Sequence, residues 1–157
     1  MAESGFIRNG AVAGAVSGAI TAAIVYATLP SVDEVLAQMK SMGIEAPVPE
    51  EALRRYLEIA LAASGVLVLL IMIALGALVG ALHGYLYKKT RLGLVGAAVA
   101  SGLIFTAILV LPNIPAGAPG SKILTNTITG LTYTAALALI TMKWDPRRYR
   151  ESEPRIT

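Results

Sequence analysis

Residues 59–87 read IALAASGVLVLLIMIALGALVGALHGYLY and contain no Asp, Glu, Lys or Arg. Three further stretches of 20 residues or more are also free of charge: Asn9–Val32, Leu92–Ser121 and Ile123–Met142. A helix of about 20 apolar residues is long enough to cross a hydrocarbon core about 30 Å thick. The sequence therefore predicts an all-α integral membrane protein, a single four-helix bundle over residues 1–157. The expected spans are residues 6–29, 56–87, 92–111 and 121–142.

The composition excludes several classes of protein. Only 15% of the 157 residues are charged, whereas a soluble domain usually carries about a quarter. A soluble globular fold, a disordered chain and a nucleic acid-binding protein are therefore excluded. Cys is absent, so the chain has no disulfide and no thiolate metal site. Asn and Gln together number only four, which is typical of thermophilic proteins that avoid thermolabile amides.

The first span has the features of a membrane helix rather than of a signal peptide. A signal peptide has a shorter apolar region that follows a basic start. Here Arg8 is the only early cation, and the apolar run continues to Leu29 before Pro30. This span also resembles the third, since both have a Gly- and Ala-rich start and a Ser-Gly pair. Either a parallel repeat or chance similarity between Gly/Ala-rich spans explains that likeness.

Residues 30–55 form the one sizeable polar segment, between the first two spans. Ser31 and Glu34 match a capping box, in which each side chain binds a free backbone N–H at a helix start. Apolar residues then recur at helical spacing up to Gly43, a typical residue for a helix end. We expect a short amphipathic helix in this outer loop, lying on the membrane surface or on the bundle itself.

The second span begins well before its apolar part. Pro49 suits the first turn of a helix, and acidic residues follow it, where the helix dipole favours them. A helix from Pro49 to Lys88 would be about 60 Å long, twice the hydrocarbon thickness, so we expect it to project from the membrane. On the solvated part, Arg54 is the expected ion-pair partner of Glu58.

The basic residues are unevenly divided between the two sides of the predicted bundle. The side with both termini holds nine of the 13 Lys and Arg residues, and the side with residues 30–56 holds four. The positive-inside rule places the more basic side in the cytoplasm. We expect a multi-pass protein of the cell membrane, with cytoplasmic termini and a cytoplasmic tail over residues 143–157.

Two rows of glycines recur at four-residue spacing in the first and second spans. They are Gly10, Gly14 and Gly18, and Gly76, Gly80 and Gly84. Such rows leave one helix face without side chains, so that two backbones can approach closely. Two interpretations remain open: the rows pair the first two spans with each other, or they bind a second copy or another membrane subunit.

His83 is the only histidine, and it lies beside the second glycine row. An ionisable group in a membrane span is a candidate functional residue, which makes His83 the one weak candidate for a metal ligand. The alternative is a neutral ring that hydrogen-bonds across a helix interface. One His without Cys or a nearby carboxylate cannot form a tight transition-metal site, so we expect no metal site and no cofactor.

The fourth span is rich in hydroxyl groups. Asn126, Thr129 and Tyr133 share one face and could line a polar path, although Thr hydroxyls also bond to the backbone of their own helix. The sequence contains no Ser-His-Asp set, no HExxH, no Walker loop and no dinucleotide fingerprint. We therefore expect no catalytic residues and no enzymatic activity.

Three segments give the chain a family resemblance. The first span opens with Ala11–Val16 (AVAGAV), the second contains Gly76–Gly80 (GALVG), and Val110–Gly120 (VLPNIPAGAPG) precedes the last span. These segments resemble the CbtA-like family of cobalt transporter subunits. The resemblance implies a subunit of a transport system. Residues 30–56 depart from the family because they contain no His, whereas its members often carry a His-rich outer segment.

Two functions are consistent with these observations. The first is a non-catalytic subunit of a membrane assembly, such as a transport system for a small solute or a metal ion. The second is a purely structural accessory subunit that packs against a larger complex through its glycine rows. In both, the expected partners are the lipid bilayer and other membrane subunits or a second copy of the chain.

Overall fold

The computed structural model describes residues 2–44 and 46–143, so the predicted tail lies outside the described residues from position 144 onward. The described residues form five α-helices and one short 3-10 helix, with no β-strand among them. These are α1 (Ala2–Thr28), α2 (Val32–Ser41), α3 (Glu50–Lys89), α4 (Gly93–Val110), η1 (Leu111–Asn113) and α5 (Gly120–Lys143).

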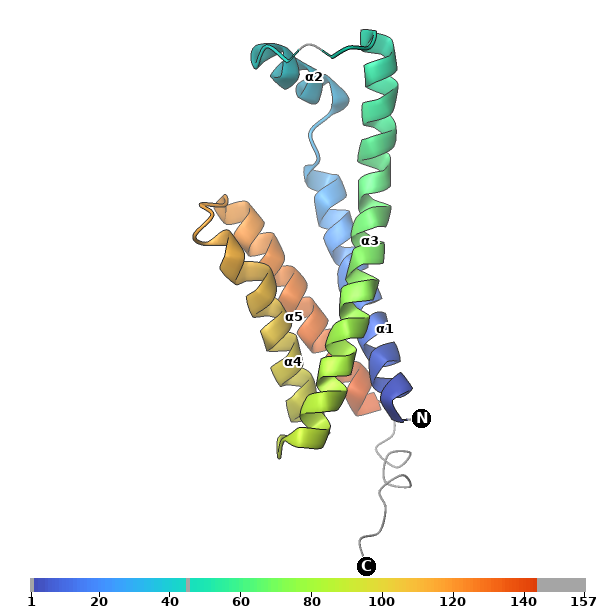
Figure 1. Cartoon of the computed structure of the whole chain (residues 1–157), viewed down its shortest axis with the longest axis vertical. Coiled ribbons are helices and arrows are strands. Elements are labelled where there is room, and N and C mark those ends of the chain that lie inside the picture. The colour runs from blue at the N-terminus through green and yellow to red at the C-terminus, as the bar shows by residue number, and fades with distance from the viewer. Residues whose placement is uncertain (1, 45, 144–157) are drawn as a thin grey trace, which may run out of the picture.

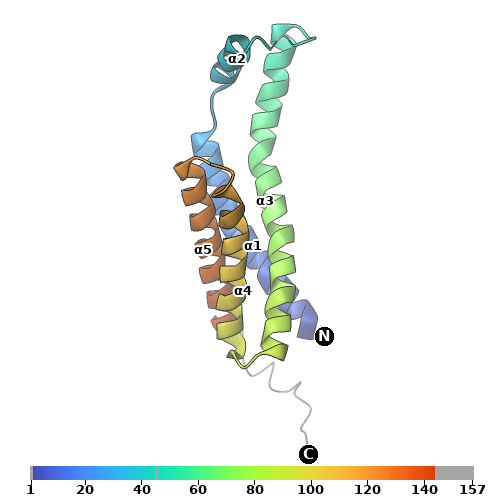
Figure 2. The same ribbon diagram turned by 60° about the vertical axis from the view of Figure 1, so that its left-hand side comes forward.

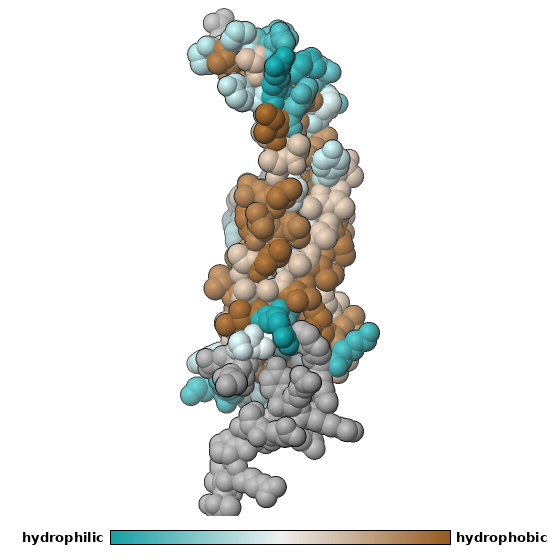
Figure 3. Space-filling model, turned by 90° about the vertical axis from the view of Figure 1, so that its right-hand side faces the viewer, coloured by the Kyte–Doolittle hydropathy of each residue, from teal (hydrophilic) through white to brown (hydrophobic). Residues whose placement is uncertain are grey.

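The chain is an all-α membrane protein, as predicted. In the described part, α1, α3, α4 and α5 are each long and apolar enough to cross a membrane. On the face drawn in Figure 3, apolar side chains cover the middle of the molecule, and polar ones lie toward its two ends. A band of this kind is what a helix bundle presents to lipid, because lipid tails solvate apolar side chains.

The four long helices form two antiparallel pairs. α1 packs along α3, and α4 packs along α5. Contacts of α1 with α5 and of α3 with α4 close the two pairs into one bundle. The pairs converge where α3 passes into α4 and diverge toward α2 (Figures 1 and 2). We call the convergent end the basic end, because Lys88, Lys89 and Arg91 lie in its turn.

The glycine rows face each other between α1 and α3. A Cβ atom added to Gly10 would lie 2.6 Å from the Cα of Gly80, and one added to Gly76 would lie 2.8 Å from the Cα of Gly14. Neither separation leaves room for a side chain, so the two backbones touch directly. The rows thus join the first two spans within one chain.

The ends of the rows meet side chains instead of backbone. A Cβ on Gly18 would lie 2.8 Å from the Cβ of Met72, and one on Gly84 would lie 2.9 Å from the ring of Phe6. All six glycines predicted to mediate packing therefore lie at contacts between α1 and α3.

The contact between α4 and α5 is reciprocal, and the sequence analysis did not identify it. A Cβ on Gly102 would lie 2.8 Å from the Cα of Thr134, and one on Gly130 would lie 2.8 Å from the Cα of Thr106. Each helix thus offers a glycine to a threonine of the other. The signal was a Gly-x-x-x-Thr pattern in both spans, which fits the small-residue spacing of membrane helix contacts.

We call α2 and the first turns of α3, residues 31–58, the head. The predicted capping box begins α2: the N–H of Ser31 donates to Oε2 of Glu34 at 2.7 Å, and the N–H of Glu34 donates to Oγ of Ser31 at 3.2 Å. Gly43 ends this helix with a φ of 67°, a conformation that glycine adopts without strain.

Two exposed ion pairs join α2 to α3 in the head. Lys40 of α2 pairs with Glu50 of α3 at 3.0 Å. Arg54 of α3 pairs with Asp33 of α2. The prediction that Arg54 pairs with Glu58 is therefore wrong. The reason is that α2 folds back beside α3 and brings a carboxylate within reach, which helical spacing within α3 alone cannot reveal.

Candidate functional site

The three residues of the predicted polar path each contact a different helix. Nδ2 of Asn126 donates to the carbonyl of Leu109 in α4 at 3.1 Å. The Thr129 hydroxyl lies 2.7 Å from the Thr21 hydroxyl in α1. These two contacts fix α5 against both of the helices that flank it in the bundle.

The third residue, Tyr133, reaches across the bundle. Its side chain is fully buried, and its hydroxyl donates to the carbonyl of Gly76 in α3 at 3.0 Å. The ring packs on Phe105, with centroids 4.8 Å apart. The polar atoms of the predicted path therefore make hydrogen bonds between helices.

Asn126 also satisfies the end of a helix. α4 stops at Val110, before Pro112, and leaves carbonyl groups without helical partners. The carbonyl of Leu109 accepts from Nδ2 of Asn113 at 2.6 Å as well as from Asn126. The amide of Asn126 thus stabilises the turn that joins α4 to α5.

His83 is fully buried between three helices near the basic end. Its Nε2 lies 3.0 Å from the carbonyl of Leu94 in α4. The ring of Phe6 in α1 meets it edge-on, with centroids 4.9 Å apart. A carbonyl can only accept, so Nε2 carries the proton, and Nδ1 of the neutral ring is an acceptor.

That acceptor is unsatisfied. Nδ1 of His83 has no hydrogen-bond partner among the described residues. The same holds, in that part of the chain, for Oδ1 of Asn9 in α1 and for the hydroxyl of Thr141 in α5. Asn9 is 3% exposed and Thr141 is 2% exposed. Buried polar groups usually have a partner, so each of these atoms requires an explanation.

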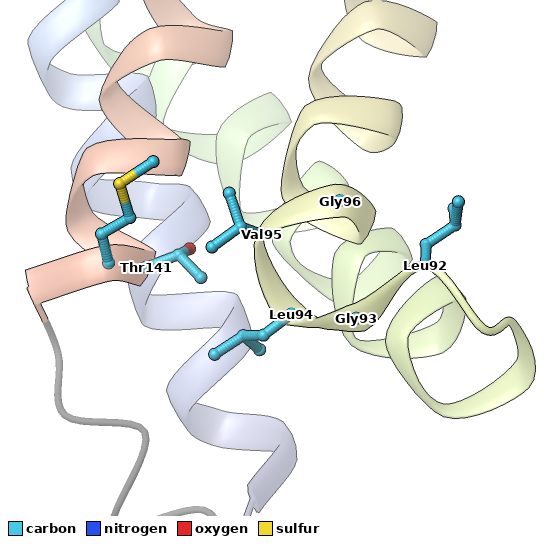
Figure 4. A pocket seen from close by; sticks show the side chains of 7 residues that line it. Leu92, Gly93, Leu94, Val95, Gly96 and Thr141 are labelled. Atoms are coloured by element: carbon cyan, nitrogen blue, oxygen red, sulfur yellow. The ribbon is translucent and has the colours of Figure 1, made fainter.

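Thr141 differs from four other threonines of α5. Its hydroxyl binds no carbonyl of its own helix, whereas four others donate to the carbonyl four residues earlier: Thr125, Thr127, Thr129 and Thr134. The side chain of Thr141 points from α5 toward the first turn of α4 (Figure 4). Its hydroxyl is therefore available to a group that lies between the helices.

The residues that carry the three unsatisfied atoms lie at one level of the bundle. Asn9 precedes Thr21 by twelve residues, and Thr141 follows Thr129 by twelve. Because Thr21 and Thr129 touch, both residues lie about 18 Å from that contact, toward the basic end. His83 joins them there through its contacts with Phe6 and Leu94.

A cavity of about 470 Å³ adjoins this level (Figure 4). It is lined by residues 92–96 at the start of α4 and by Thr141 and Met142 of α5. Leu94 lines the cavity, and its carbonyl accepts the hydrogen bond of His83. We call Asn9, His83 and Thr141 the polar triad, and regard it as the candidate site.

His83 stood out in the sequence as the only histidine, whereas Asn9 and Thr141 were not recognised as candidate site residues. Asn9 carried a signal, since it is one of four Asn and Gln residues in the chain and begins a charge-free span. Thr141 carried none, because it looks like the other threonines of its helix. Within the described ranges, no three His, Cys, Asp or Glu side chains are placed to hold a metal ion.

Comparisons with known proteins give no relatives for this chain. No family model matches it, and neither a curated protein nor a solved structure does.

Proposed function

We propose that this multi-pass membrane protein is a non-catalytic subunit of a membrane assembly and that its head docks to a partner subunit. The observation that carries the proposal is the length of α3. It has 40 residues and is about 60 Å long, so it extends well beyond the other spans (Figure 1). A helix that only crossed the membrane would need about half that length.

The surface of the head supports a protein partner. Glu50, Glu51 and Arg55 are too polar for the hydrocarbon core and keep this part of α3 outside it. Yet Met42 is 59% exposed, Ile44 is 49% exposed and Tyr56 is 65% exposed. Apolar side chains beside charged ones, outside the lipid, are typical of surfaces that bind protein.

A purely structural accessory subunit is the alternative function. In that case too, the head is the better contact surface, because the glycine rows are already occupied by the α1–α3 contact. The resemblance to CbtA-like proteins favours a transport system as the assembly. The polar triad favours a small polar solute over a metal ion as its cargo, since it supplies a single imidazole and no carboxylate.

The test is the size of the native complex after extraction in a mild detergent. We expect a species much larger than one chain with its detergent. Ile44→Asp should reduce it to the single chain, while Gln38→Asp, which adds the same charge on the polar side of α2, should leave it intact. A single chain in the native extract would contradict the subunit role.

A further inference from the structure

We propose that the polar triad binds a small hydrogen-bond donor of the size of water or ammonium. Asn9, His83 and Thr141 are buried side chains of α1, α3 and α5, and the last two lie against the first turn of α4. This site is independent of the docking surface on the head, and it lies at the opposite end of the molecule (Figure 1).

The chemistry of the three atoms sets the class of ligand. Nδ1 of His83 is an acceptor because Nε2 donates to Leu94. Oδ1 of Asn9 is an acceptor by nature, and the Thr141 hydroxyl can donate or accept. A ligand that satisfies all three must therefore present at least two N–H or O–H groups. Water and ammonium both do so, whereas an anion or a bare carbonyl would meet two acceptors.

The burial of the triad supplies the driving force. Leaving a buried polar group without a partner is unfavourable, and here three residues at one level carry such groups. Each polar partner that a ligand supplies removes one of these penalties. Apolar ligands would leave all three penalties in place, which gives the site its selectivity.

The cavity beside α4 gives the ligand a route to the site. Thr141 lines it and belongs to the triad, so the site adjoins the cavity at this residue. Gly93 and Gly96 have no side chains, so they add nothing to this wall of the cavity that would block the route (Figure 4). The route begins at the basic end, near the turn with Lys88 and Arg91.

One histidine makes the proposal directly measurable. Because His83 is the only His, selective ¹⁵N labelling of the full chain in micelles reports a single ring. The ¹⁵N shift of Nδ1 distinguishes a free lone pair from one that accepts a hydrogen bond. Spectra should be compared in sodium chloride and in ammonium chloride, at equal ionic strength and pH.

We expect the signature of a hydrogen-bonded Nδ1. A saturable shift with ammonium identifies ammonium as the ligand, whereas the same signature in both salts identifies water. Thr141→Val should abolish the signature or weaken ammonium binding at least tenfold, and Thr141→Ser should retain it. Thr125→Val is the matched control, because that hydroxyl binds only its own helix.

Two results would overturn the site. The first is a free lone pair on Nδ1 in both salts. The second is a hydrogen-bonded signature that survives both Thr141→Val and Asn9→Leu in folded protein, because the donor would then belong to another group.

Discussion

At the scale of single residues, Tyr133 makes a hydrogen bond that joins the two pairs of helices. It is fully buried in α5, and its hydroxyl donates to the carbonyl of Gly76 in α3. Gly76 lies in the row where α1 and α3 touch. As a glycine it has no side chain that could cover this carbonyl. One hydroxyl therefore ties the second pair of helices to the first at its closest contact.

We predict that Tyr133→Phe lowers the free energy of unfolding by about 0.6 kcal/mol, the average for hydrogen bonds between membrane helices. The loss is small because the Gly76 carbonyl keeps its bond within α3. Reversible unfolding in mixed detergent micelles measures it. Tyr85→Phe, at an exposed position, is the control and should change nothing. Equal stabilities for the two variants would contradict the role of the hydroxyl.

His83 gives a second prediction at this scale. Titration calorimetry of the purified chain with cobalt should detect no stoichiometric site of micromolar affinity, because one imidazole without a carboxylate or thiolate holds such an ion weakly. The nearby cations Lys88, Lys89 and Arg91 repel a divalent ion about twice as strongly as a monovalent one. A tight site that His83→Gln removes would contradict this prediction and would favour metal transport.

At the scale of elements, the closest contact in the molecule is that of α1 with α3. It depends on the absence of side chains at four positions, Gly10, Gly14, Gly76 and Gly80, where backbone meets backbone. Close approach of this kind gains dispersion energy and weak Cα–H···O contacts along the whole row. A single added methyl group is therefore enough to disturb the pair.

We predict that Gly10→Ala destabilises the fold by about 1–3 kcal/mol, as overpacking of a tight interface does. Its Cβ would lie 2.6 Å from the Cα of Gly80, which cannot move away without moving α3. Gly65→Ala is the matched control, since its Cβ would meet only the Cβ of Ala22, at 3.9 Å. Thermal unfolding in detergent compares the two. Equal melting temperatures would show that α1 and α3 do not touch in the protein.

The elements themselves were predictable from the sequence, because their signal is strong and local. Four charge-free runs predicted the four spans, and Ser31, Glu34 and Gly43 predicted the start and end of α2. The spacing of the glycines predicted a packing face. It did not predict which face would meet which, since a row of glycines is equally suited to a partner within the chain or outside it.

The candidate site was much less predictable. His83 stood out as the only histidine, but Thr141 resembles the other threonines of α5 until its hydroxyl is seen to lack a partner. The Arg54–Asp33 pair escaped the sequence analysis for a related reason. Both features depend on how helices far apart in sequence come to lie side by side, and spacing within one helix carries no information on that.

At the scale of the whole molecule, charge is divided between two ends. The head carries the ion pairs Lys40–Glu50, Arg54–Asp33 and Arg55–Glu51. The basic end carries the turn from Lys88 to Arg91. The positive-inside rule predicts that the basic end faces the cytoplasm. The orientation of the chain is independent of how its helices pack, so it needs its own test.

We predict that a cysteine at Gln38 is labelled by an impermeant reagent added to intact cells, and that one at Thr90 is not. Both residues are exposed and at opposite ends, and the chain has no cysteine of its own to interfere. Labelling of Thr90→Cys after the membrane is opened is the control for its reactivity. The reverse pattern would place the head in the cytoplasm.

The unequal lengths of α3 and α4 also act on the bilayer. The charge-free part of α3 is about 43 Å long, whereas α4, with 18 residues, is about 27 Å long. Where the bundle does not tilt, lipids beside α3 must therefore stretch more than those beside α4, at a cost of fractions of a kcal/mol per Å of mismatch. A protein with two flanks of unequal length has its lowest energy where thick and thin regions of a membrane adjoin. We expect the protein to collect at such boundaries in vesicles of mixed chain length.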